Sequence, residues 1–139
     1  MDFSNINYLA VLVAAGAAFA LGAAWYGASI FGKIWQKELG FTDEYLQQGN
    51  MGKIFGSSFV LMLIMALGMA MLVQGHSDGE AIGWLQGLYH GLYVGLFFIA
   101  TSIGINLLYQ RKSIKLWLID SLYQVVFLAL MGAILGAWQ

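Results

Sequence analysis

The sequence predicts an all-α integral membrane protein in which one domain, residues 1–139, forms a bundle of four transmembrane helices. Hydrophobic residues make up 60% of the chain and charged residues only 9%, whereas a typical soluble domain is roughly 25% charged. Seven acidic and six basic side chains are too few to cover the surface of a soluble protein of this length. We therefore expect the outer surface of the bundle to face a lipid bilayer.

Four long apolar segments carry this prediction, at about residues 8–31, 54–73, 81–108 and 114–137. A helix needs about 20 residues to cross the hydrocarbon core of a membrane, and the alternating segments of a membrane β-barrel are missing. The first segment is longer than the roughly 7 to 15 residues of a signal-peptide core, and no basic region precedes it. We therefore expect the first segment to be a retained span.

The first connection covers residues 32–53, and about residues 33–50 of it have a helical pattern of their own. Trp35 and Leu39 alternate with lysines, which predicts a short helix lying in the membrane interface. Gly40 is expected to end that helix, and Thr42 is expected to cap a second short helix.

The basic residues predict the orientation of the chain. All of them fall in the first and third connections: Lys33, Lys37, Lys53, Arg111, Lys112 and Lys115. These two connections share one side in a four-span protein, and the positive-inside rule places that side in the cytoplasm. We therefore predict a multi-pass protein of the inner (cytoplasmic) membrane with both termini outside.

The residue inventory excludes several functional classes. No cysteine is present, which excludes disulfides, thiolate metal sites and thiol catalysis. A net charge of −1 gives no reason to expect nucleic acid as a partner. The metalloprotease, nucleophile-elbow, phosphate-loop and dinucleotide-binding motifs are also missing. We therefore predict a protein that is not an enzyme and has no metal site.

Glycine spacing predicts close helix packing. Small residues recur at every fourth position of the third segment, at Gly83, Gly87, Gly91 and Gly95. Such GxxxG stripes let helix backbones approach each other in lipid. Because every segment carries a stripe of this kind, we expect the protein to form a homo-oligomer.

Polar residues predict a site in the cytoplasmic half of the bundle. Counted from a span centre near Val126, a rise of about 1.5 Å per residue places Asp120 about 9 Å toward the cytoplasm. Ser102 and Asn106 are its expected partners at that depth. The sequence leaves open whether Asp120 binds a cation, carries a proton, orients a polar substrate, or only joins helices. The candidate ligand-binding residues are Trp25, Tyr26, Ser57, Ser102, Asn106, Asp120, Tyr123 and Gln124.

His90 is the candidate for a cofactor. Gly87 and Gly91 beside it leave room for a flat macrocycle, and imidazole is a common axial ligand of haem iron. The competing interpretation is a histidine that hydrogen-bonds a neighbour. His90 is expected roughly 15 to 20 Å from Asp120 along the membrane normal, and His76 is expected to be solvated in a polar turn.

Two blocks of sequence resemble a bacterial membrane protein family known as domain of unknown function 1761. The first is FALGAAWYGASIFGKIWQKELGFT, residues 19–42, and the second is INLLYQRKSIKLWLIDSLYQVVFLALMGAILGAW, residues 105–138. The resemblance implies a four-span membrane protein and no established activity. Members of that family often carry a proline where this chain has Gly27 or Ala28, and commonly an amide where Asp120 stands.

These observations support three hypotheses about function. The first is an oligomeric transport or small-ligand-binding module whose site is the polar layer around Asp120. The second is a structural or assembly subunit of a larger membrane complex, in which the same polar groups join the helices. The third is binding of haem or chlorin through His90; beyond that alternative we predict no cofactor.

Overall fold

The computed structural model describes residues 3–76 and 80–139, and that part of the chain is helical, without strands. The long helices are α1 (Tyr8–Trp25), α4 (Met51–Gln74), the run of α5 (Gly83–Val94), η1 (Gly95–Ala100) and α6 (Thr101–Tyr109), and α7 (Ile114–Ala137). Four helices in the described part are long and apolar enough to cross a membrane. The predicted all-α fold class is confirmed, and the four helices suggest a multi-pass membrane protein.

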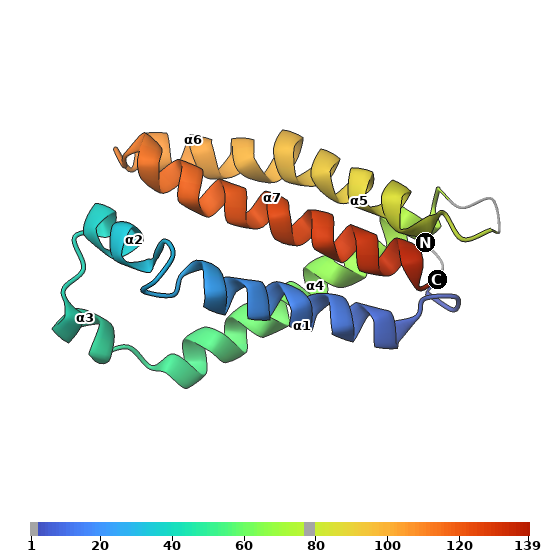
Figure 1. Ribbon diagram of the computed structural model, residues 1–139, viewed down its shortest axis with the longest axis horizontal. Coiled ribbons are helices and arrows are strands. Elements are labelled where there is room, and N and C mark those ends of the chain that lie inside the picture. Colours follow the sequence, from blue (N-terminus) through green and yellow to red (C-terminus); the bar gives the residue numbers. More distant parts are fainter. Residues whose placement is uncertain (1–2, 77–79) are drawn as a thin grey trace.

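The helices run between two distinct ends of the bundle (Figure 1). The start of α1, the end of α4, the start of α5 and the end of α7 lie at one end, which we call the terminal end. The short helices α2 (Gly32–Leu39) and α3 (Asp43–Gln47) and the turn from α6 to α7 lie at the other, the basic end. Every lysine and the arginine of the chain belong to the segments at the basic end.

Side-chain caps explain where several helices begin. Asn7, Asn50 and Ser113 stand before α1, α4 and α7, and each accepts a hydrogen bond from a backbone N–H of the first turn. Thr42 caps α3 in the same way, with the Tyr45 N–H 3.1 Å from its Oγ1. Gly40 ends α2 with φ of 70°, a conformation that glycine adopts without a Cβ clash.

The first span ends earlier than the apolar run of residues 8–31. Helix α1 stops at Trp25, and residues 26–31 form a tight turn before α2. In this turn the Phe31 N–H donates to Trp25 O and the Gly32 N–H donates to Gly27 O. A Cβ on Gly32 would lie 2.3 Å from Tyr26 O, so only glycine fits. The turn folds α2 back against α7.

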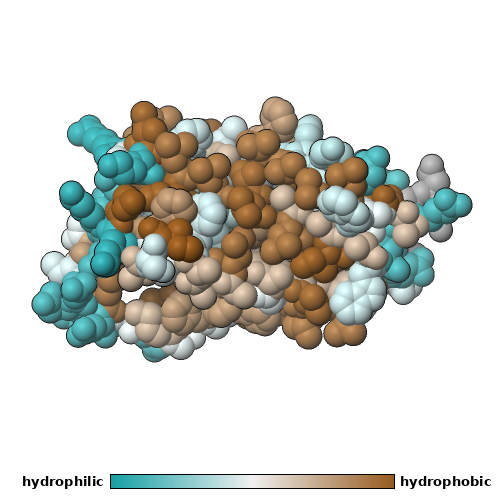
Figure 2. Space-filling view, in the orientation of Figure 1, coloured by the Kyte–Doolittle hydropathy of each residue, from teal (hydrophilic) through white to brown (hydrophobic). Residues whose placement is uncertain are grey.

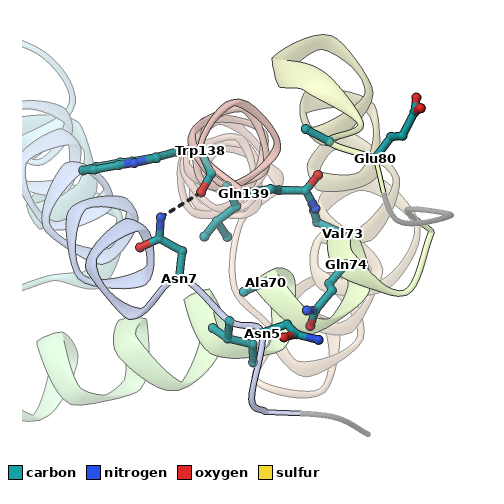
Figure 3. A pocket seen from close by; sticks show the side chains of 11 residues that line it. Asn5, Asn7, Ala70, Val73, Gln74, Glu80, Trp138 and Gln139 are labelled. Atoms are coloured by element: carbon teal, nitrogen blue, oxygen red, sulfur yellow. Dashed lines mark hydrogen bonds between the residues drawn. The ribbon is translucent and has the colours of Figure 1, made fainter.

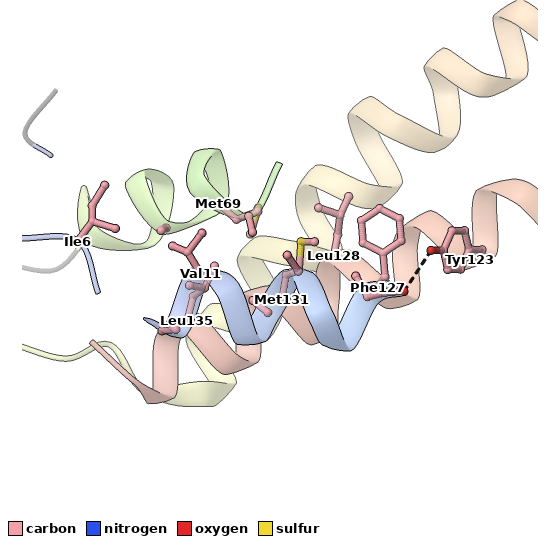
Figure 4. Close-up of a cluster of buried hydrophobic side chains, with 14 residues drawn as sticks. Ile6, Val11, Met69, Tyr123, Phe127, Leu128, Met131 and Leu135 are labelled. Atoms are coloured by element: carbon pink, nitrogen blue, oxygen red, sulfur yellow. Dashed lines mark hydrogen bonds between the residues drawn. The ribbon is translucent and has the colours of Figure 1, made fainter. Parts of the chain in front are cut away.

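Helix α7 lies at the centre of the bundle and contacts α1, α4 and α5. Its side chains Phe127, Leu128 and Met131 are at most 1% exposed, and Figure 4 shows them within the buried cluster. The face of α1 toward this cluster is made of alanines with no exposed area: Ala10, Ala14, Ala15 and Ala18. Small side chains on α1 therefore make room for the large side chains of α7.

The glycines of the third span pack against α7 of the same chain. A Cβ on Gly87 would lie 2.0 Å from Gly132 O, and one on Gly91 would lie 2.0 Å from Leu128 O. Helices this close can contact each other only through glycine. The stripe from which the sequence predicts self-association is thus filled within one chain. Gly16 of α1, in contrast, has no atom within 4 Å of the Cβ position.

The outward faces of the long helices are apolar. Leu61, Ile64, Phe97 and Leu108 are each more than 60% exposed. Figure 2 shows a band of hydrophobic side chains between two hydrophilic ends. An exposed apolar surface of this extent marks contact with lipid or with other proteins, and the apolar helices suggest a lipid environment.

Candidate functional site

A cavity of about 1190 Å³ lies in the half of the bundle near the basic end. Residues from α1, α2, α3, α4, α6 and α7 line it, together with the segments between α1 and α4. Figure 2 shows the surface hollowed near this end. We call this space the Asp120 cavity, because Asp120 contributes the carboxylate among its lining residues.

Asp120 of α7 interacts with two neighbouring segments. The Tyr26 hydroxyl, just after α1, donates to Asp120 Oδ1 over 2.7 Å. The side chain of Trp35 in α2 also interacts with this carboxylate. The early end of α1 makes this arrangement possible, because the turn at residues 26–31 carries Tyr26 and Trp35 to the same side of α7.

Aromatic rings form a continuous wall beside the carboxylate. The ring centroid of Tyr26 lies 5.2 Å from that of Tyr123 and 5.6 Å from that of Trp35. Trp35 contacts Phe41 at 5.8 Å, and Phe41 contacts Tyr45 at 4.6 Å. These spacings are typical of edge-to-face and tilted aromatic pairs. We call these five residues the aromatic wall, and all of them line the Asp120 cavity.

Two hydrogen-bond donors beside the cavity join α1 to α7. The Tyr123 hydroxyl donates to Ala18 O over 3.2 Å, and Trp25 Nε1 donates to Ile119 O over 3.1 Å. Gln124 also lines the cavity, and among the described residues its buried Oε1 has no hydrogen-bond partner.

No basic residue lines the cavity in the part of the chain that the structure describes. Lys115 is the basic residue of α7, five positions before Asp120. Its Nζ lies 3.7 Å from Glu38 Oε1, and its side chain is well exposed. Ser113 also donates a hydrogen bond to Glu38. The Glu38 carboxylate is thus paired at the basic end, whereas the Asp120 carboxylate has only neutral partners, Tyr26 and Trp35.

The structure brings together part of the site expected from the sequence. Tyr26, Asp120, Tyr123 and Gln124 line the cavity. Trp25 lies behind them, with its ring centroid 6.3 Å from that of Tyr123. The remaining expected residues are exposed and do not line the cavity: Ser57, Ser102 and Asn106.

A π-helical segment explains why Ser102 and Asn106 turn away from Asp120. In an unbroken α-helix Ser102 and Asn106 would lie on the same face as Gly95. They follow Gly95 by 7 and 11 residues, and both steps bring the side-chain direction back to within about 20° of that of Gly95. The six residues of η1 carry a wider turn, which rotates the following helix. Ala100 is buried instead, and its carbonyl accepts a hydrogen bond from Trp117 Nε1 over 2.9 Å.

The aromatic residues of the first connection were missing from the expected site. Trp35, Phe41 and Tyr45 line the cavity, although their sequence pattern is that of an interfacial helix. The alternation of apolar and charged residues over 33–50 indicates an amphipathic segment but leaves open what its apolar face contacts. Ser58 lines the cavity where the sequence suggested its neighbour Ser57.

His90 and His76 lie side by side at the terminal end, with ring centroids 4.7 Å apart. Nδ1 of each ring lies 2.8 Å from the backbone carbonyl four residues earlier in the chain. His76 therefore contacts another ring as well as solvent. The binding of haem or chlorin through His90 stays a prediction.

A smaller pocket of about 390 Å³ lies at the terminal end (Figure 3). Residues from both chain ends and from the end of α4 line it. Asn7 Nδ2 donates to Trp138 O over 3.2 Å, and the Ile82 N–H donates to Gln139 Oε1 over 2.8 Å. The first bond joins the two ends of the chain, and the second joins Gln139 to the start of α5. We assign both bonds a structural role.

Comparisons with curated proteins and with solved structures gave no match. The model of one family, described as "Protein of unknown function (DUF1761)", matches residues 9–136. This range is nearly the whole chain and includes every residue that lines the Asp120 cavity. The chain therefore belongs to the DUF1761 family, as the two sequence blocks predicted.

Proposed function

We propose that the protein is a small-ligand-binding module that serves transport across a membrane, and that the Asp120 cavity is its binding site. The observation that carries this proposal is a cavity of about 1190 Å³ with a carboxylate in its wall. Pockets of about 300–1,000 Å³ are large enough for drug-sized ligands. Carboxylates inside membrane spans mark substrate or ion pathways and often face a water-filled cavity.

The distribution of charge supports an orientation for this module. All six basic residues belong to segments at the basic end, and lysine and arginine are enriched on the cytoplasmic side of membrane proteins. We propose that the basic end is cytoplasmic, that both termini are outside, and that the membrane is the cytoplasmic membrane of a bacterium. A ligand would then reach the cavity from the cytoplasmic half.

Self-association is part of the proposal. Ala20 and Ala24 of α1 are exposed, and Gly16 has open space at its Cβ position. These residues form a stripe of small side chains on the outer face of α1, and such stripes let helices of two copies approach closely. Cross-linking of the protein in lipid nanodiscs would detect a homo-oligomer, and Gly16→Leu would abolish it if this stripe is the interface.

A structural role is the second candidate function, and the hydrogen bonds of the site favour it. Tyr26 to Asp120, Trp25 to Ile119 O and Tyr123 to Ala18 O all join α1 or its end to α7. In a subunit that stabilises a larger membrane complex, these bonds would serve only to hold the helices together. Such a subunit would co-purify with its complex and would bind no small molecule in the cavity.

A pair of neighbouring serines separates the two candidates. Ser58 lines the cavity, whereas Ser57 is exposed outside it. Ser58→Trp would place a bulky indole ring in the cavity, and Ser57→Trp is the matched control. The assay measures the unfolding temperature of the protein in nanodiscs with a panel of drug-sized cations, anions and neutral amphiphiles. A bound compound raises this temperature, because a ligand at 100 times its Kd stabilises the folded state by about 2.7 kcal/mol.

We expect at least one compound of the panel to raise the unfolding temperature of the wild type and of Ser57→Trp, and to leave Ser58→Trp unchanged. A panel without any stabilising compound would contradict the binding function. Equal responses of Ser58→Trp and Ser57→Trp would also contradict it, because the binding would then occur outside the cavity.

A further inference from the structure

We propose that the ligand of the Asp120 cavity is an organic cation, an ammonium or phosphonium group on an apolar body. This inference rests on the proposed function and adds the chemical class of the ligand. It is based on the charge of the cavity and on its aromatic wall.

The charge of the cavity is unbalanced. The Asp120 carboxylate lines the cavity, accepts a hydrogen bond from Tyr26 and interacts with Trp35, and both of these side chains are neutral. In the described part of the chain no lysine, arginine or histidine lines the same space. A carboxylate taken out of water without an opposite charge is costly. A cationic ligand would supply that charge, whereas an anion would be repelled.

The aromatic wall supplies the second part of a cation site. Three rings of the wall lie near the carboxylate, those of Tyr26, Trp35 and Tyr123. The ring centroid of Tyr26 is 5.6 Å from that of Trp35 and 5.2 Å from that of Tyr123. A cation within about 6 Å of an aromatic face is attracted by the ring quadrupole, and the attraction is strongest for tryptophan. Aromatic rings around a carboxylate therefore favour a cation with a large apolar surface.

The size and composition of the cavity argue against an inorganic ion as its ligand. The described residues contain no group of three His, Cys, Asp or Glu side chains that could hold a metal ion. Calcium takes six to eight oxygen ligands, and magnesium requires an octahedral shell. One carboxylate in a cavity of about 1190 Å³ instead leaves most of the space to be filled by apolar groups.

The test compares two probes of the same shape and opposite charge, tetraphenylphosphonium and tetraphenylborate. Calorimetry measures their binding to the full chain in phosphatidylcholine nanodiscs, with empty nanodiscs as the blank. We expect tetraphenylphosphonium to bind the wild type at least about tenfold more tightly than tetraphenylborate. Asp120→Asn should weaken tetraphenylphosphonium binding by at least about tenfold.

Two further variants keep the test informative if Asp120→Asn does not fold, which circular dichroism will show. Trp35→Leu removes a ring of the aromatic wall and should weaken tetraphenylphosphonium binding about threefold to tenfold. Asn106→Ala is the control, because Asn106 is exposed and does not line the cavity. Its affinity for tetraphenylphosphonium should stay within about twofold of the wild type.

Equal affinity for the two probes, or an Asp120→Asn or Trp35→Leu variant that folds and binds tetraphenylphosphonium like the wild type, would overturn the organic-cation inference. In that case a neutral compound that stabilises Ser57→Trp but not Ser58→Trp would still support the proposed function. If no compound distinguishes these two serine variants, the proposed function fails as well.

Discussion

The contact between α5 and α7 gives a prediction whose magnitude follows from the backbone. A Cβ added to Gly91 would lie 2.0 Å from Leu128 O and 2.7 Å from Ala129 Cα. Non-bonded heavy atoms need roughly 3.4 Å. Because both obstructing atoms belong to the backbone of α7, no side-chain rotation relieves the overlap. Gly91→Ala must therefore push the two helices apart locally by about 1.4 Å.

The expected cost combines two opposing effects. Overpacking of a tight interface costs about 1–3 kcal/mol, whereas replacing a mid-helix glycine with alanine contributes about 1 kcal/mol of helix propensity. Gly68→Ala is the matched control, because Gly68 lies in α4 and nothing stands within 4 Å of its Cβ position. The free energy of unfolding should be about 1–3 kcal/mol lower for Gly91→Ala than for Gly68→Ala.

The free energy of unfolding can be measured in mixed micelles by titration with sodium dodecyl sulfate, with helix content as the readout. Both variants change glycine to alanine inside a long helix, so the difference between them isolates the steric effect. If Gly91→Ala proves as stable as Gly68→Ala, the close approach of α5 and α7 is refuted, and with it the packing of the glycine stripe within one chain.

Two further predictions concern the site and the orientation. Tyr26→Phe removes the 2.7 Å hydrogen bond to Asp120 and should lower the free energy of unfolding in the same titration by about 1.5–3 kcal/mol; a loss below about 0.5 kcal/mol would show that this bond does not hold the turn against α7. The chain has no cysteine, so single cysteines at Lys112 and Gln139 can be labelled with a membrane-impermeant maleimide in sealed vesicles. We expect labelling from opposite faces, and labelling from the same face would contradict the proposed orientation.

The apolar runs were sufficient to predict the four long helices, since burial of backbone polar groups inside a membrane leaves helices as the simplest solution. Gly40 and Thr42 were likewise sufficient to predict the break between α2 and α3, because helix caps depend on residues within one turn. Local chemistry decides both features, and local chemistry can be recognised in a sequence.

The candidate site could be predicted only in part, because its other residues depend on rotation and on contacts distant in sequence. Asp120 and Tyr26 were recognisable as polar groups at a similar depth. The outward rotation of Asn106 after η1 was not, since no residue in Gly95–Ala100 marks a π-helix. Trp35 was also unrecognisable as a partner of Asp120, because its pattern fits an interfacial helix equally well.

Composition and the length of the apolar runs were enough to indicate a membrane protein with four long helices. Which side chains line the Asp120 cavity depends on the tertiary structure. The early end of α1, the return of α2 and the wide turn of η1 are small changes in backbone direction. Each changes which side chains lie near Asp120, because a shift of one position along a helix rotates the direction of the side chain by about 100°.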